Sequence, residues 1–217
     1  MRVEHLSRPL RPDVILLIIA LIATGSAVQG VLGEAPAATT PHTTTLIVFA
    51  KHEIPEGEWT ALLAAMHHGV TETAKDAPAL RGPVEILRGD EVPRGLHVDE
   101  PIPVYLHGDC RLMPRPRYIQ AGRLGWVIRV HGHIEPFIHV DCTQLVDMLG
   151  PIALQMTANR RNTVMGEAIT RVVMHEWIHI VTQSPEHATE GVEKPQFGVT
   201  DLLADDETAQ RKRGRKS

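Results

Sequence analysis

Residues 172–181 read VVMHEWIHIV and contain a His-Glu-x-x-His pattern at residues 175–179. Successive residues of an α-helix are about 100° apart, so His179 lies about 40° round from His175, with Glu176 about 60° beyond His179. Two imidazoles one turn apart can take two positions of a tetrahedral zinc ion, while the carboxylate can reach a water at an open position. Since the flanking residues carry no charge, we expect a zinc-binding helix buried beneath a cleft.

The same helix is predicted to run from about Asn162 to Gln183 and to end before Pro185. Beyond this break, His187 stands eight residues after His179, so the chain can turn back and present a third imidazole to the metal. His187 is therefore the preferred third ligand. The alternatives are a carboxylate from Glu186, Glu190 or Asp201, or no third protein ligand at all.

Upstream of this helix, hydrophobic periodicity predicts one strand, one helix, four strands and a short helix. The strands are expected at residues 46–50, 84–88, 102–107, 124–131 and 134–140, and the helices begin near Ile54 and at Asp141. The last two strands form a hairpin around Gly132, in which Pro136 must sit where no ladder N–H is needed. The Gly150-Pro151 pair is expected to stop the short helix. This order predicts an α+β fold, with a small mixed sheet packed on an amphipathic helix and on the His-Glu-x-x-His helix.

The motif with its uncharged flanks resembles the zincin metallopeptidases, and the order of predicted elements is similar to the N-terminal subdomain of their metzincin branch. Together these features cover roughly residues 46–187. Metzincins have a glycine three residues after the second histidine and a third histidine three residues further, but Thr182 and Pro185 occupy these positions here. No methionine follows His179, so the methionine turn of that branch is also missing. The resemblance therefore implies a zincin-like peptidase, with residues 124–130 as a cleft rim that pairs with extended substrate, but not a metzincin.

The composition of the 217-residue chain, 43% hydrophobic and 22% charged, is typical of a folded globular protein. We expect a linker at residues 31–45, one domain at residues 46–203 and a charged, solvated tail at residues 204–217. The net charge of -4 argues against nucleic-acid binding. The chain has 13 histidines but only 4% Phe, Trp and Tyr, and this excess of imidazole side chains indicates metal binding.

An apolar run, VILLIIALIA, occupies residues 14–23 and follows a segment with three arginines. This layout is typical of a signal peptide, predicted here at residues 1–30. The alternatives are an uncleaved membrane anchor through residues 14–32 and a buried core helix. We therefore expect an exported protein, extracellular or periplasmic, that is either secreted or anchored to the membrane.

Cys110 and Cys142 are the only cysteines, so a zinc knuckle or a thioredoxin-type redox site is excluded. In an exported protein an even pair predicts one disulfide, and the alternative is two buried thiols. The remaining histidine clusters are given no catalytic role. His131, His133 and His139 are expected to be surface imidazoles at the hairpin turn, and His67 and His68 lie on a helix face.

The sequence thus predicts a zinc metallopeptidase that hydrolyses peptide or protein substrates. One Zn²⁺ per chain would be held by His175, His179 and His187, with Glu176 as the general base that activates a water. The alternative function is a non-catalytic, zinc-stabilised binding or envelope-structural module. The intact Glu176 argues against this alternative, because a structural zinc site needs no such carboxylate.

Overall fold

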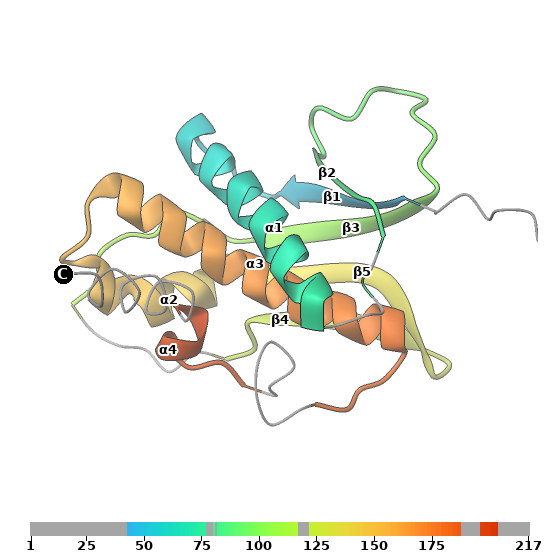
Figure 1. The fold of residues 1–217 in the computed structure, drawn as a ribbon. Helices are drawn as coiled ribbons and strands as arrows, with labels where there is room; N and C mark the ends of the chain where they lie inside the picture. Colours follow the sequence, from blue (N-terminus) through green and yellow to red (C-terminus); the bar gives the residue numbers. More distant parts are fainter. Residues whose placement is uncertain (1–42, 77–79, 81, 117–121, 188–195, 204–217) are drawn as a thin grey trace, which may run out of the picture. The chain divides into compact units, whose positions relative to one another are not determined.

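A computed structural model describes residues 43–76, 80, 82–116, 122–187 and 196–203 (Figure 1). The elements are β1 (Thr44–Ala50), α1 (Glu56–Asp76), β2 (Val84–Arg88), β3 (Glu100–His107), β4 (Gly125–Val130), β5 (His133–Asp141), α2 (Cys142–Ala153), α3 (Ala158–Thr182) and α4 (Val199–Leu202). This order matches the predicted strand, helix, four strands and helices. The predicted export segment, residues 31–42 of the linker and the tail lie outside the described residues. Within the described ranges no helix is long and apolar enough to cross a membrane.

The five strands form one mixed sheet in the order β2-β1-β3-β5-β4. Neighbouring strands are parallel except for β4, which runs antiparallel to β5. The hairpin turns at His131 and Gly132, both of which have positive φ (50° and 87°), as a tight two-residue turn requires. Pro136 faces an irregular stretch of the β4–β5 ladder between Val127 and Arg129, so its missing N–H costs no regular pair. The mixed sheet with its helices is consistent with the predicted α+β class.

Alternate strand residues build the core between the sheet and the helices α1 and α3, which pack on each other (Figure 1). Leu46 on β1, Val104 on β3 and Ile138 on β5 are fully buried on this face. Burial of each such side chain contributes about 1.5 to 3 kcal/mol. The two helices cross closely, since a Cβ at Gly166 would lie 3.1 Å from the Cα of Leu62. The helix α3, which carries the His-Glu-x-x-His motif, therefore packs closely against both α1 and the sheet.

The opposite face of the sheet carries a row of stacked rings. Neighbouring rings in this row have centroids 5.0 to 5.5 Å apart. The row consists of Phe49, Tyr105, His139, Trp126 and His107. His131 and His133 are exposed beside the turn as expected. For His139 the expectation of a surface imidazole at a turn is wrong, because it lies within β5 and stacks between two aromatic rings.

Two helix boundaries differ from the sequence prediction. The helix α2 does not stop at Gly150-Pro151 but continues to Ala153. The glycine serves close packing instead, because a Cβ there would lie 2.8 Å from the Cβ of Arg115, whose N–H donates to the Gly150 carbonyl. The helix α3 begins four residues earlier than expected, at Ala158, since the Thr157 hydroxyl caps it by accepting from the Arg160 N–H.

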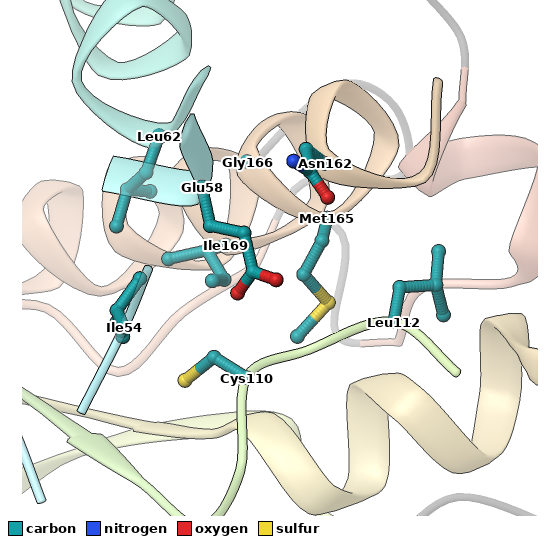
Figure 2. Close-up of a pocket in the computed structure, with 9 residues that line it drawn as sticks. All are labelled: Ile54, Glu58, Leu62, Cys110, Leu112, Asn162, Met165, Gly166 and Ile169. Atoms are coloured by element: carbon teal, nitrogen blue, oxygen red, sulfur yellow. The ribbon is translucent and has the colours of Figure 1, made fainter. Parts of the chain in front are cut away.

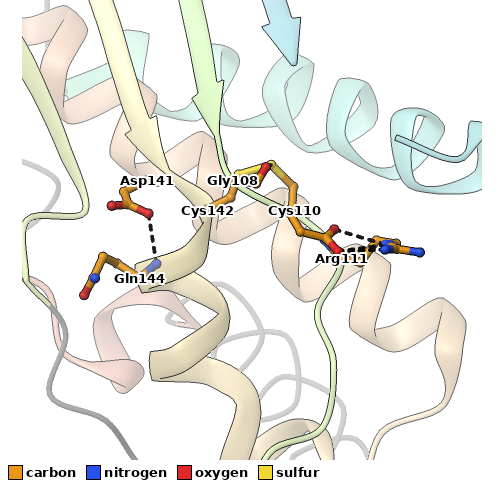
Figure 3. Close-up of a disulfide and its surroundings, with 7 residues drawn as sticks. Gly108, Cys110, Arg111, Asp141, Cys142 and Gln144 are labelled. Carbon is orange, nitrogen blue, oxygen red and sulfur yellow. Dashed lines mark hydrogen bonds and ion pairs between the residues drawn. A yellow bond between two sulfur atoms is a disulfide. The ribbon is translucent and has the colours of Figure 1, made fainter. Parts of the chain in front are cut away.

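The predicted pairing of the two cysteines is confirmed, with Cys110 and Cys142 joined in a disulfide whose Cα atoms are 4.8 Å apart (Figure 3). Cys110 follows the end of β3, and Cys142 is the first residue of α2, directly after β5. Beside the bond, the Asp141 carboxylate caps α2 by accepting from the Gln144 N–H at 3.1 Å. The disulfide thus ties together the carboxyl ends of two neighbouring parallel strands.

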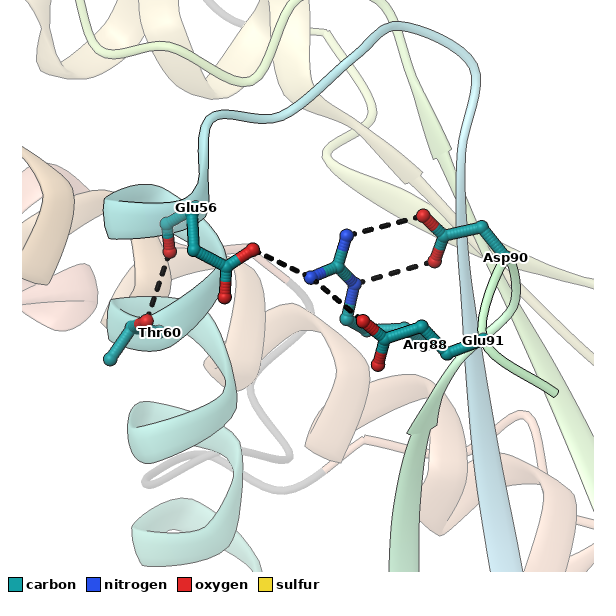
Figure 4. A network of polar contacts seen from close by, with 5 residues as sticks. All are labelled: Glu56, Thr60, Arg88, Asp90 and Glu91. Atoms are coloured by element: carbon teal, nitrogen blue, oxygen red, sulfur yellow. Dashed lines mark hydrogen bonds and ion pairs between the residues drawn. The ribbon is translucent and has the colours of Figure 1, made fainter.

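At the other side of the sheet, Arg88 connects the end of β2 to the start of α1 (Figure 4). Its guanidinium lies 2.7 Å from the Glu56 carboxylate and 3.1 Å from the carboxylates of Asp90 and Glu91. It also stacks over the Trp59 ring, 4.8 Å from the centroid. All the acids are exposed, so each pair adds little stability, but together with the Trp59 ring they hold the arginine from several sides.

Candidate metal centre

The helix α3 buries the motif residues against the core. His175, Glu176 and His179 are exposed by only 7%, 6% and 8% of their surface. The Nε2 atoms of His175 and His179 lie 3.1 Å apart, and their rings stand at 86° to each other. Two ligands about 2.0 Å from a tetrahedral zinc ion would be about 3.3 Å apart, so the pair is already close to the required geometry.

The end of α3 turns the chain back toward these two imidazoles. Gln183 has a left-handed backbone (φ 53°), a conformation that favours glycine. Its side-chain amide holds this conformation, because Oε1 accepts from the Ile134 N–H at 2.8 Å and Nε2 donates to the Ile134 carbonyl at 3.0 Å. The helix end is therefore fixed to the start of β5 by a glutamine side chain.

The turn brings His187 to the motif. The ligand atoms of His175, His179 and His187 all lie within 4.8 Å of one another, so these three side chains could hold a metal ion. No other group of three or more His, Cys, Asp or Glu in the described part of the chain has this arrangement. Burial, and then the neighbouring His179, lower the pKa of His187, which favours the neutral imidazole that binds metal.

Two of the three acids considered as third metal ligands, Glu186 and Asp201, lie in the described part of the chain and do not join the two imidazoles. Asp201 is occupied at the start of α4, where its carboxylate accepts from the Gly198 N–H at 2.8 Å. Glu186 is exposed, and neither residue belongs to the metal-binding group. Glu190 lies outside the described residues. Among the third ligands considered from sequence, His187 is the one that the described structure brings to the motif.

A carbonyl group behind the site orients one ligand. The Nδ1 atom of His179 lies 2.6 Å from the carbonyl oxygen of Ser184. Since a carbonyl only accepts, Nδ1 must carry the proton, which leaves the lone pair of Nε2 directed at the metal position. Residues just past the helix end thus select the tautomer that binds metal.

Glu176 lies beside the imidazoles and next to the strand β4. Burial raises the pKa of Glu176 to about 7, and the charge of Arg123 acts in the opposite direction. A metal cation nearby would likewise favour the ionised carboxylate. The close approach of β4 depends on Gly125, because a Cβ there would lie 3.1 Å from Oε1 of Glu176 and would collide with Val172. An alanine at this position would push the strand away from the helix.

The three imidazoles and Glu176 open into a cleft of about 730 Å³. Residues 122–127 and Arg129, along β4, line the same cleft. Phe197, from the segment before α4, completes it and places its ring 5.3 Å from that of His175. Since β4 is the last strand of the sheet, one of its edges has no neighbouring strand among the described residues. A potential metal, a carboxylate and a free strand edge therefore meet in one open site.

A second carboxylate, that of the half-buried Glu58, has a different environment. Glu58 enters a cavity of only about 10 Å³ between α1, α3 and Cys110 (Figure 2). Burial raises its pKa, while Arg111 lowers it and Asp109 raises it further. A space of this size holds about one water molecule, so it admits no substrate. Burial alone therefore does not distinguish Glu176, whose cleft is large and open.

Several residues of the site have no signal in the sequence. The roles of Gly125, Arg123 and the Ser184 carbonyl depend on how β4 and α3 meet in space. Gln183 could have been singled out, because the predicted helix ends there without a glycine. Comparison of the chain with protein families, curated proteins and solved structures gives no match. Function must therefore be argued from the residues of the site.

Proposed function

We propose that this chain is a zinc metallopeptidase that holds one zinc ion through His175, His179 and His187. The observation that supports this most is the presence of three convergent imidazoles and a buried carboxylate in one open cleft. Structural zinc sites have four protein ligands and are closed, whereas catalytic sites have three and keep one position open. The zincin resemblance of residues 172–181 agrees with this assignment.

The chemistry divides between the metal and the protein. Zinc bound here would act as a Lewis acid, lowering the pKa of a water and polarising the scissile carbonyl. Glu176 takes the proton from the attacking water and returns it to the leaving amine. The low exposure of Glu176, 6%, keeps this proton transfer away from bulk solvent. The free edge of β4 pairs with an extended peptide and aligns it across the cleft.

We also propose that the protein is exported, and that it is either secreted after cleavage of residues 1–30 or held at the membrane through residues 14–32. The disulfide between Cys110 and Cys142 supports an oxidising compartment. The proposed partners are peptides or proteins, and the net charge of -4 speaks against nucleic acid. The competing function is a non-catalytic zinc-stabilised module, for which Glu176 would have no use.

One experiment separates the two functions. The purified full chain is assayed for zinc content and for cleavage of a mixture of random peptides, beside the Glu176→Gln variant and Glu186→Gln as a control. We expect about one zinc per chain in all three proteins. Glu176→Gln should lower hydrolysis by about 10² to 10⁴, because it removes the base and keeps the shape, while the exposed Glu186 should not matter.

Two results would contradict the proposal. A chain that contains zinc but cleaves no peptide would favour the structural module. Cleavage by Glu176→Gln at the rate of the parent would show that another group acts as the base.

A further inference from the structure

The cleft has a charge balance opposite to that of the whole chain. The chain has a net charge of -4, yet the described residues that line the cleft include two arginines, Arg123 and Arg129, and only one acid, Glu176. As a general base Glu176 is ionised, so it offsets the charge of one of the two arginines. The described lining therefore keeps a net positive charge even before a metal binds.

Arg123 is held in place by its neighbours on both sides. The Gly122 N–H donates to the side chain of Gln144 on α2 at 2.6 Å. The Leu124 carbonyl accepts from the Asp141 N–H at 2.8 Å. The backbone on either side of Arg123 is thus bonded to α2 and to the end of β5, and the exposed Arg123 lines the same cleft as Glu176.

Other arginines of the fold are used differently. Arg88, Arg111 and Arg115 each form an ion pair with an aspartate close to them. Arg129 uses its Nε–H to bond the Gly132 carbonyl at 3.0 Å. For Arg123 no ion pair with an acid occurs within the described residues. A guanidinium that lines a cleft on a fixed backbone and has no acid partner among the described residues is suited to bind a carboxylate of a ligand.

Building on the proposed function, we propose that Arg123 selects peptide substrates that carry a carboxylate beside the scissile bond. Arg123 and Glu176 line the same cleft, so the guanidinium can meet the substrate near the reacting carbonyl, and its planar fork can bind a carboxylate with two hydrogen bonds. Arg129, further along β4, would add a weaker attraction, because one of its donors is already used. Acidic peptides are the expected substrate class, and peptides with lysine at the same place are disfavoured.

The proposed preference for acidic peptides can be tested by measuring peptide binding in a variant that lacks the general base. The full chain with Glu176→Gln is titrated with dye-labelled octapeptide mixtures that have random flanks and a fixed central Glu, Gln or Lys, and fluorescence anisotropy gives the affinities. The Glu mixture should bind about threefold to tenfold more tightly than the Gln mixture, and the Lys mixture should bind most weakly. Rising salt should reduce this difference, because screening weakens exposed charge pairs.

Variants assign the effect to one side chain. Adding Arg123→Gln should remove the preference for Glu over Gln and leave binding of the Gln mixture unchanged. Arg129→Gln should reduce the preference only in part, and Arg94→Gln, an exposed arginine outside the cleft, should have no effect. Equal binding of the Glu and Gln mixtures, no binding of any mixture, or a preference that survives Arg123→Gln would overturn the proposal. If the preference is found but the unmutated chain cleaves no peptide, the proposed peptidase activity fails and the binding role of Arg123 remains.

Discussion

In the described part of this chain histidines come together in two separate groups, but only one group has the geometry of a metal site. In the metal centre, His175 and His187 stack at 19°, His179 stands at 86° and 78° to them, and the ligand atoms of the three rings lie within 4.8 Å of one another. On the outer face of the sheet, His107 and His139 stack at 28°, with Nε2 of one 2.9 Å from Nδ1 of the other. The difference is that the outer pair shares one hydrogen bond between two ring nitrogens, whereas three ligand atoms gathered around one point can hold an ion.

The two groups of histidines also form for different structural reasons, one from helical spacing and the other from strand pairing. Helical spacing sets His175 and His179 one turn apart, so the sequence alone predicts that they meet. His107 and His139 meet because β3 and β5 are neighbours and their register places Tyr105 opposite His139. A shift of one residue in this register would turn His139 to the core. The helical pair of the metal centre is therefore encoded locally, whereas the outer pair depends on the assembled sheet.

The largest effect should come from breaking the metal centre at His179. We expect His179→Ala to lose both zinc and peptide cleavage, because the remaining two imidazoles come from separate segments and cannot hold the ion alone. Elemental analysis after growth in zinc-replete medium measures the metal directly. The matched control is His107→Ala, which removes an imidazole of the outer pair and should keep one zinc per chain. Equal zinc loss in both variants would erase the distinction between the two groups.

A smaller loss is expected from the third imidazole. His187→Ala removes one donor but leaves the helical pair, so zinc affinity should fall by on the order of 10²-fold, at least as much as loss of an outer-shell partner. Competition with a chromogenic chelator gives the affinity. Unchanged zinc binding would make Glu186, Glu190 or Asp201 the better third ligand.

The disulfide offers a change that should act on the outer pair and spare the metal centre. It joins the segments that follow β3 and β5, the strands that carry His107 and His139. The double variant Cys110→Ser and Cys142→Ser should lose about 3 to 4 kcal/mol of stability, from the freedom regained by a loop of 32 residues in the unfolded chain. Urea unfolding measures this loss. The variant should still bind one zinc per chain, and two titratable thiols in the oxidised parent would contradict the bond itself.

The smallest effect concerns the pH dependence of the outer pair. Burial, and then the neighbouring His107, lower the pKa of His139, so the folded chain keeps this ring neutral. In the unfolded chain the His139 ring binds a proton as the pH falls below about 6.5, whereas in the folded chain it does so only at lower pH. The free energy of unfolding is therefore unaffected by this ring at higher pH and decreases as the pH falls below about 6.5. His139→Phe keeps the stack, and its Tm should therefore fall less between pH 7.5 and pH 5.5 than that of the parent. The exposed His133→Phe should behave like the parent.

The sequence predicted the parts of this fold that depend on local periodicity. The order of the elements, the hairpin at Gly132 and the motif on α3 follow from spacing and turn residues. The predicted strand at residues 134–140 includes His139, but its stacking between two rings was not predicted, because the neighbouring strands and their register are not visible in the sequence. The extension of α2 past Gly150 was also missed, because the glycine serves a contact with Arg115 from a distant segment. Arg123 was missed for the same reason, since only the assembled cleft places it beside Glu176.

The bonds of Gln183 also determine where the chain can change in length. Its amide pairs with both backbone groups of Ile134, so the end of α3 and the start of β5 are held as one piece. A residue inserted between His179 and Gln183 would rotate that amide by about 100° around the helix and break both bonds. A residue inserted after Pro185 would alter only the path to His187. Insertions and deletions between His179 and Gln183 should therefore destabilise the fold, whereas those after the proline should affect only zinc binding through His187.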